Sequence, residues 1–309
     1  MASRDPRADI VDKDPFPQPK IRRIHSSETS SGSSMFTIED LQNMFAGKQA
    51  TTQPTSNKKV WEFSDIEKQH LGLATAAFTL ALGFMAVRGL RGISELGLDA
   101  WIITLLLAMP VMLLAVGPAF IFHEFGHKLV AKKYGCWAEF RADPKGLRFG
   151  IMLSFFIGVV FMAPGAVMVS GLTKRRYNGH IAVAGPLTNL SLFIIGIPIW
   201  VFILGITGAF NSDYSSLFDG KLESVYLDGN SIVWQSMLID SAKVWLYGNL
   251  FFGLFNMIPW GPLDGAKVKD WNEQVFYVVF LVFLIPLLSM FLGFWSPTTL
   301  LEWLVNKLF

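Results

Sequence analysis

The sequence predicts an α-helical polytopic membrane protein with about five to six transmembrane helices. Hydrophobic residues make up 52% of its 309 residues and charged residues only 16%, whereas soluble domains carry about 25% charged residues. The charges are also concentrated, so that long uncharged stretches alternate with short polar ones. The net charge is only +2 and the basic residues form short clusters beside apolar runs. We therefore expect the lipid bilayer as the surroundings and no nucleic acid as a partner.

Residues 1–60 are predicted to form a mostly disordered polar tail, and residues 61–309 a transmembrane domain. The tail holds four prolines between positions 6 and 19 and a serine-rich run at 26–34. Such a composition buries too little apolar surface to offset the chain entropy. Hydrophobic residues between 38 and 45 fall on one helical face and predict a short helix. We favour a transient helix in a linker over a helix that docks on the rest of the protein. We expect no cleavable signal peptide, because these residues contain no apolar stretch.

Uncharged stretches long enough to cross a membrane begin at residue 71. A spanning helix needs about 20 apolar residues, and we interpret five stretches as spans: 71–87, 100–122, 181–212, 244–263 and 274–301. A further uncharged stretch, 149–173, holds four glycines and a proline, and glycine at this density weakens a helix. We therefore expect the region around 135–173 to be re-entrant and partly extended, like a β-hairpin. Protein or a water-filled cavity must then cover its backbone.

The lysine and arginine residues predict an orientation. If 149–173 does not cross and the tail is cytoplasmic, most of the 26 basic residues lie on the cytoplasmic side, including the cluster at 174–176. The long loop 211–241 on the other side is rich in acidic residues. This arrangement satisfies the positive-inside rule. We therefore expect a multi-pass protein of the cell membrane with a cytoplasmic N-terminus.

The second span ends in His123-Glu124-Phe125-Gly126-His127. Positions four apart stack on one face of a helix, so His123 and His127 can bind one metal ion while Glu124 reaches a water molecule on it. A polar cluster that only packs helices together is the structural alternative. The apolar surroundings favour a metal site, because ionisable groups inside a membrane are costly and commonly functional.

A catalytic zinc site takes three protein ligands and a water molecule, so a third ligand must come from elsewhere. Asp264 is the best candidate, because it follows an uncharged run of 20 residues and two prolines that break a helix. In the predicted topology Asp264 and His127 lie toward the same face of the membrane. The alternative is that Asp264 only caps a turn with Gly265. The single cysteine excludes a cysteine-based zinc site and an internal disulfide.

The segments HEFGH (123–127) and NMIPWGPLDG (256–265), on separate spans, resemble those of the site-2 protease family of intramembrane zinc metalloproteases. The segment AGPLTN (184–189) is similar to the family's A-G-P-x-x-N pattern. Two more segments, FRADPKGLR (140–148) and APGAV (163–167), resemble prokaryotic members, and no PDZ-like insert is visible. The similarity covers residues from about 70 to about 300.

This resemblance implies a zinc metalloendopeptidase that hydrolyses peptide bonds within or near the transmembrane segments of other proteins. It implies zinc as the cofactor, with His123, His127 and Asp264 as ligands and Glu124 as the base. The implied substrates are single-span membrane proteins, often membrane-tethered regulators that another protease has trimmed.

Two asparagines in apolar spans, Asn189 and Asn256, are candidates for holding the substrate backbone or assisting the oxyanion. Hydrogen bonding between helices is the alternative for both. His180 lies beside a basic cluster, and we interpret it as an interfacial residue and not a ligand. Because a helical substrate resists proteolysis, we also expect the 149–173 region to hold the substrate extended along a strand edge.

Two other functions fit parts of the pattern. A catalytically silent relative would bind helices as a membrane scaffold or chaperone, but the intact set of His, Glu, His and Asp argues against it. A zinc transporter would need ionisable positions along a path across the membrane, whereas here they gather near one face. Since His127 lies five residues before Lys132, or about 7 Å along a helix, we expect an active site below the cytoplasmic boundary.

Overall fold

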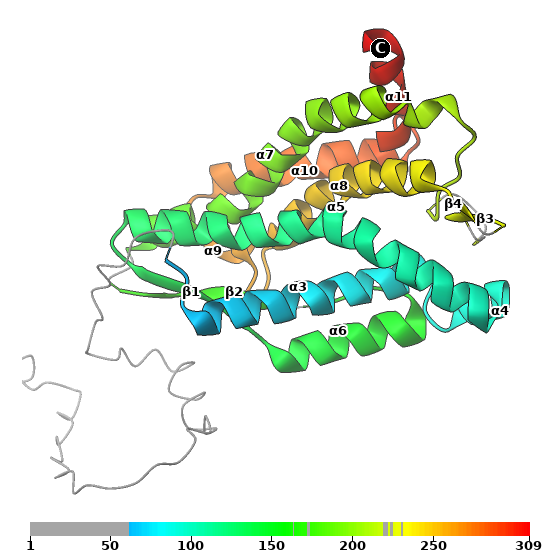
Figure 1. Ribbon diagram of the computed structural model, residues 1–309. Coiled ribbons are helices and arrows are strands. Elements are labelled where there is room, and N and C mark those ends of the chain that lie inside the picture. The colour runs from blue at the N-terminus through cyan, green and yellow to red at the C-terminus, as the bar shows by residue number, and fades with distance from the viewer. Residues whose placement is uncertain (1–61, 163, 172–173, 219–221, 223–224, 230) are drawn as a thin grey trace, which may run out of the picture. The chain divides into compact units, whose positions relative to one another are not determined.

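The computed structural model describes residues 62–309 apart from 163, 172–173, 219–221, 223–224 and 230. The predicted tail and the short helix expected in it therefore lie outside the described residues. The described chain is mostly helical, and the fold class of a helical polytopic membrane protein is confirmed (Figure 1). Its helices that are long and apolar enough to cross a membrane are α3 (Asp65–Ala86), α5 (Leu98–Lys133), α7 (Arg175–Thr207) and α10 (Glu273–Phe291).

The helix found at the predicted span 244–263 has other bounds and another character. Helix α8 runs from Trp234 to Asn256, and it is not among the apolar spans of the described chain. Its sequence contains several polar residues, and two of them, Asp240 and Asn249, are fully buried, as polar groups of a membrane bundle are. By length and composition the described residues contain four apolar spans, fewer than the five to six that the sequence predicted.

Helix α5 carries the histidine motif and contacts α3, α7 and α8. Its 36 residues correspond to roughly 54 Å at 1.5 Å per residue, well beyond the ~30 Å of a hydrocarbon core. Pro110 and Pro118 lie inside it, and Figure 1 shows the helix bending along its length. Helix α3 runs antiparallel to α5, since Glu67 contacts Lys128 near one end and Gly83 lies against Met109 near the other.

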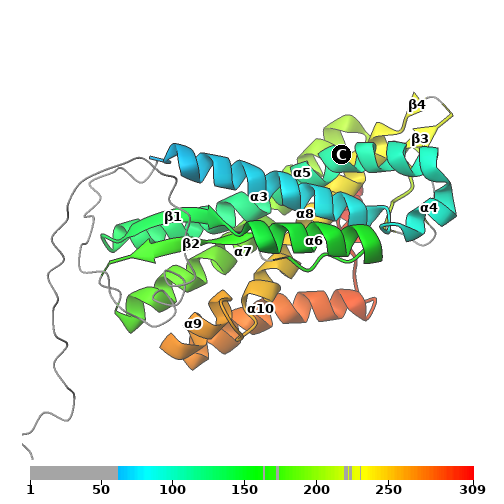
Figure 2. The ribbon, with the colours of Figure 1, turned by 90° about the horizontal axis from the view of Figure 1, so that it is seen from below.

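The region expected to be re-entrant contains two strands and one helix (Figure 2). Strand β1 (Trp137–Ala142) pairs antiparallel with β2 (Gly165–Ser170), which confirms that the region is partly extended. Between them lies helix α6 (Pro144–Ile157), which the glycine content of the sequence did not predict.

The positions of the glycines explain why a helix forms there. Asp143 caps α6 by accepting a hydrogen bond from the Lys145 amide. Gly158 ends the helix in a left-handed conformation, with φ of 77°, and Gly165 and Gly171, also at positive φ, mark the two ends of β2. Glycine therefore bounds these elements more than it interrupts them. The 14 residues of α6 span about 21 Å, too short to cross a hydrocarbon core of ~30 Å.

The remaining elements lie toward the ends of the long helices. Figures 1 and 2 both show α9 at the end that carries β1 and β2, and α4, β3 and β4 at the opposite end. The bounds of these elements are α4 Arg91–Leu96, η1 Ala209–Asn211, β3 Leu227–Asp228, β4 Ser231–Ile232, α9 Asp264–Trp271 and α11 Pro297–Leu308.

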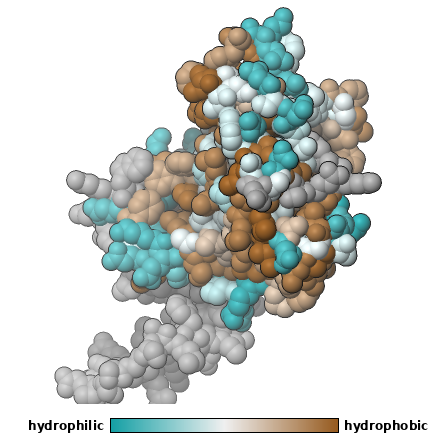
Figure 3. Space-filling model, turned by 45° about the vertical axis from the view of Figure 1, so that its right-hand side comes forward, coloured by the Kyte–Doolittle hydropathy of each residue, from teal (hydrophilic) through white to brown (hydrophobic). Residues whose placement is uncertain are grey.

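Large hydrophobic side chains are exposed along the candidate spans. Leu106 of α5, Phe202 of α7 and Ile285 of α10 are 64%, 58% and 59% exposed. Figure 3 shows hydrophobic residues over the middle of the face it presents and hydrophilic residues toward its margins. Soluble proteins rarely expose large apolar areas. These flanks therefore face lipid, as expected for a multi-pass membrane protein.

Candidate metal centre

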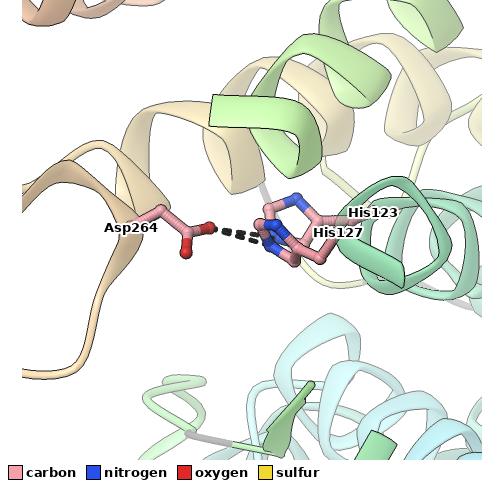
Figure 4. A group of neighbouring side chains, drawn as sticks. All are labelled: His123, His127 and Asp264. Carbon is pink, nitrogen blue, oxygen red and sulfur yellow. Dashed lines mark hydrogen bonds and ion pairs between the residues drawn. The ribbon is translucent and has the colours of Figure 1, made fainter. Parts of the chain in front are cut away.

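The histidine motif and Asp264 meet in the interior of the protein. His123 and His127 are 1% and 7% exposed, and their Nε2 atoms lie 3.1 Å apart, because residues four apart stack on one face of α5. Asp264, the first residue of α9, reaches them from the opposite side (Figure 4). Its Oδ2 lies 3.0 Å from His127 Nε2 and 3.4 Å from His123 Nε2.

These three distances fit one zinc ion. Zinc binds nitrogen and oxygen at about 2.0–2.2 Å, so neighbouring ligand atoms of a tetrahedral site lie roughly 3.3 Å apart. The observed separations of 3.0, 3.1 and 3.4 Å bracket this value. In the part of the chain that the structure describes, these residues form a group of His, Cys, Asp or Glu side chains that could hold a metal ion.

Hydrogen bonds behind each imidazole leave both Nε2 atoms available to a metal. His127 Nδ1 lies 2.7 Å from the carbonyl oxygen of Ile181, and because a carbonyl only accepts, Nδ1 must carry the proton. His123 Nδ1 lies 2.6 Å from Asn189 Oδ1. The Nδ2 of Asn189 donates to a backbone carbonyl of α5 and to Asn249 Oδ1, both at 3.0 Å, so Oδ1 is the accepting atom. With the Nδ1 atoms engaged in these bonds, the Nε2 atoms, which point toward Asp264, are the ring nitrogens placed to bind a metal.

Asn189 serves this network. Its side chain is fully buried, its oxygen holds His123 and its nitrogen is engaged twice. These contacts are of the kind that the alternative, hydrogen bonding between helices, describes. A partner of this kind fixes the tautomer and the orientation of an imidazole that binds a metal. A contact between Asn189 and substrate stays a prediction.

Asn256 lies half-buried at the end of α8, where its Nδ2 donates to the Phe252 carbonyl of the same helix. A contact between Asn256 and substrate stays a prediction. Sequence reasoning missed Asn249, which accepts from Asn189 and donates to the Trp245 carbonyl. Its position in the sequence could have suggested a functional role, because Asn249 is a polar residue in the uncharged run 244–263, seven residues before Asn256.

His180 lies apart from the metal centre. Its Nδ1 is hydrogen-bonded to the Tyr134 hydroxyl, and its ring meets Trp271 edge-on at 4.5 Å between centroids. It does not belong to the group of candidate metal ligands, in agreement with its interpretation as a residue that is not a ligand.

Two glycines let α5 and α7 approach closely enough for these contacts. A Cβ on Gly185 would lie 2.4 Å from His127 Nε2 and 2.6 Å from His123 Nε2. A Cβ on Gly126 would lie 2.4 Å from Thr188 Oγ1. Any side chain at position 185 would therefore displace the imidazoles, which explains the glycine in the segment 184–189.

A buried ion pair fixes α5 directly after the second histidine. Lys128 Nζ lies 2.6 Å from Glu67 Oε2, with the two side chains 2% and 1% exposed. Lys128 also donates to the Glu62 carbonyl at 3.2 Å and lies 3.8 Å above the Phe63 ring. The other oxygen of Glu67 accepts from the Phe140 amide at 3.1 Å. The pair therefore joins α3, α5 and β1. This contact could not be predicted from the sequence, in which Lys128 is one of several basic residues between 128 and 148.

Comparisons with known proteins agree with this geometry. The family model described as Peptidase family M50 matches residues 111–275, more than half of the chain. A Methanocaldococcus jannaschii protein named as a putative zinc metalloprotease is 36% identical over 197 residues, which cover 62% of this chain and 84% of that protein. A Bacillus subtilis protein, also named as a putative zinc metalloprotease, is 26% identical over 170 residues, which cover 52% of this chain and 68% of that protein.

A second Methanocaldococcus jannaschii protein, named as a zinc metalloprotease, is 26% identical over 148 residues, which cover 48% of this chain and 30% of that protein. No solved structure matches the chain. The matched range 111–275 contains both the histidine motif and Asp264, and the apolar helices make the chain a multi-pass membrane protein. The chain belongs to peptidase family M50, the site-2 protease family, and is a zinc metallopeptidase.

Proposed function

We propose that this peptidase cleaves single-span membrane proteins within or near their transmembrane segments, and that membrane-tethered regulators are among its substrates. In this proposal His123, His127 and Asp264 bind the zinc ion and Glu124 is the base. The observation that carries the proposal is a buried group of three ligand atoms in a chain with four apolar spans. Membrane spans that hold a catalytic metal ion between them would place it at the level of the transmembrane segments of other proteins.

The chemistry divides between the metal and Glu124. A zinc ion held by these residues would supply a Lewis acid, which lowers the pKa of a bound water molecule and polarises a peptide carbonyl. Glu124 is rotated by about 100° from His123 around the helix, and its buried carboxylate is not one of the three candidate ligands. It can take the proton of the attacking water and deliver it to the leaving amine. The hydrogen bonds on Nδ1 hold both imidazoles in place during these transfers.

The two-stranded sheet has one edge that α3 covers. The amides of Phe140 and Ala142 point away from β2 and donate to Glu67 Oε1 and His70 Nδ1 at 3.1 and 3.2 Å. Side chains of α3 therefore satisfy the outer edge of β1. The other edge belongs to β2, and no third strand pairs with it in the described part of the chain.

This β2 edge faces Glu124. Val167 and Gly165 lie opposite Phe140 and Ala142. In an antiparallel pair, two opposite residues direct their backbone groups either both toward the partner strand or both away from it. The backbone groups of Val167 and Gly165 therefore point away from β1. Val167 and Glu124 line one cavity, and β2 contacts α5, the helix that carries Glu124. A substrate that pairs with β2 by β-augmentation would pass directly beside Glu124.

We also propose that the end of the protein with the metal centre faces the cytoplasm and that the protein resides in the cell membrane. Lys132 and Lys133 end α5, and Arg175 and Arg176 begin α7. Positive charge at these helix ends favours a cytoplasmic location. Water would then reach the zinc from the cytoplasmic side.

Cleavage of single-span proteins by the purified, zinc-loaded protein in detergent tests the proposal. We expect mass spectrometry of both products to place the cut within or beside the apolar segment. A chelator is expected to stop cleavage and added zinc to restore it. Cuts that fall only in soluble loops would contradict the proposed substrate class. No cleavage of any member of a broad panel would favour a membrane scaffold or chaperone.

Val167→Pro is expected to lower kcat/KM for single-span substrates by about 5- to 150-fold. The reason is the loss of one outward amide, which leaves a substrate carbonyl unpaired at about 1–3 kcal/mol. Val167→Ala keeps the amide and is the matched control, and thermal unfolding of both variants checks that the sheet stays folded. Unchanged cleavage by a folded Val167→Pro variant would rule out pairing at this edge.

A further inference from the structure

A cavity of about 790 Å³ lies between α3 and α5, and Glu124 forms part of its wall. This volume lies within the ~300–1,000 Å³ typical of ligand sites. Its walls are mostly apolar and come chiefly from α3, α5 and the two strands β1 and β2, with Leu71, Leu113, Ile121, Phe125 and Val167 among the lining residues. The metal ligands do not line it. The cavity is therefore a separate space beside the base.

Polar and aromatic side chains close one end of this cavity. Glu67 and Lys128 form their buried ion pair there, and the ring of Phe63 stacks on Phe125 at 5.9 Å between centroids. From this end the cavity extends along both helices, past Glu124, toward Met109. The Glu67–Lys128 pair and the Phe63 and Phe125 rings therefore mark one end of the part of the cavity that contains Glu124.

Gly72 lies on α3 at the depth of Glu124. The buried ion pair holds the two antiparallel helices together on one side of this level. On the other side, a Cβ on Gly117 would lie 3.9 Å from Thr75. Between these contacts both Gly72 and Glu124 line the cavity. Gly72 is exposed and a Cβ placed on it would meet nothing within 4 Å, so the missing side chain leaves the α3 wall of the cavity open at this position.

We propose that the space between Gly72 and Glu124 is the specificity pocket for one substrate side chain next to the scissile bond, and that it selects a large apolar side chain. The proposal rests on the proposed function, with the substrate strand paired to β2. Cross-strand neighbours direct their side chains to the same face of a sheet. Because Val167 lines the cavity, the substrate residue opposite Val167 points into it. Leucine, methionine and phenylalanine suit apolar walls, whereas an unpaired charge there is costly.

Cleavage of a single-span test substrate, with each flanking position of the mapped cut changed in turn to Ala, Leu, Phe or Lys, tests this pocket. The wild type is expected to prefer Leu or Phe over Ala at one position by about 10- to 200-fold in kcat/KM. Gly72→Leu fills the pocket and is expected to lower kcat/KM for the Phe substrate at least about 10-fold relative to the Ala substrate. Gly72→Ala is expected to shift the preference in the same direction by less.

Leu73→Phe is the matched control, because Leu73 is 51% exposed and does not line the cavity. It is expected to leave the preference unchanged. A folded, zinc-loaded Gly72→Leu variant that slows every substrate by the same factor would overturn the pocket and indicate another occupant, such as a lipid acyl chain. Should Gly72→Leu fail to fold, an unshifted preference in Gly72→Ala would overturn it equally. In both cases wild-type cleavage within the apolar segment leaves the proposed function standing, whereas a wild type that cleaves no substrate overturns that function itself.

Discussion

Glu124→Gln is expected to abolish cleavage and to leave the zinc bound. Glutamine keeps the shape of the side chain but cannot accept the proton of the attacking water, and general base catalysis contributes about 10²- to 10⁴-fold. The three atoms that fit a zinc ion belong to His123, His127 and Asp264, so this substitution touches none of them. Zinc per mole of protein, measured by mass spectrometry, and cleavage under single-turnover conditions provide the two readouts.

Asp264→Ala is the informative comparison for this variant. It removes a candidate ligand, so zinc and activity are expected to fall together, since a catalytic zinc site needs three protein ligands. Zinc retained in Glu124→Gln and lost in Asp264→Ala would separate the base from the ligand set. Substantial cleavage by Glu124→Gln would contradict the role of Glu124, and full zinc in Asp264→Ala would contradict the assignment of Asp264.

The elements of the candidate site that follow from local rules could be predicted from the sequence. Two histidines four residues apart on a helix must share a face. Asp264 could be anticipated because prolines end the preceding helix and let a new one, α9, begin at this residue. The distance between the histidines and Asp264, by contrast, depends on how three helices pack, and a single sequence contains no direct measure of that.

The parts that could not be predicted depend on which way a polar side chain points. The hydrogen bond between Asn189 and His123 could not be read from the sequence, which shows the apolar neighbours of Asn189 and not its partner on another helix. The glycines after Gly150 predicted a weak helix, yet Gly158 ends α6 without interrupting it. Helix α8 was placed too late in the chain because Asp240, a buried charge, resembled a loop residue. For Asn189 and α8 the deciding contacts are tertiary, whereas for α6 the position of the glycines outweighs their number.

Lys128→Met is expected to destabilise the protein by about 3–5 kcal/mol, the cost of leaving one member of a buried ion pair without its partner. Methionine has a similar length and keeps an apolar contact with the Phe63 ring. The Glu67 carboxylate, however, would retain only the Phe140 amide on its other oxygen. Thermal unfolding in detergent, followed by tryptophan fluorescence, is expected to show a Tm lower by roughly 6–20 °C.

The double variant Glu67→Gln, Lys128→Met separates buried charge from packing. Glutamine at position 67 keeps an oxygen that can accept from the Phe140 amide, while the double change removes both charges. Because a buried ion pair often contributes little compared with neutral residues of similar volume, the double variant is expected to recover most of the lost stability, to within about 1–2 kcal/mol of the wild type. A double variant as unstable as Lys128→Met would show that Lys128 stabilises α3, α5 and β1 through packing, and that the charge of Glu67 is not the cause. Recovery would show that Lys128→Met destabilises the protein because it leaves the buried charge of Glu67 without its partner. The ion pair lies directly after His127, the second histidine of the metal centre.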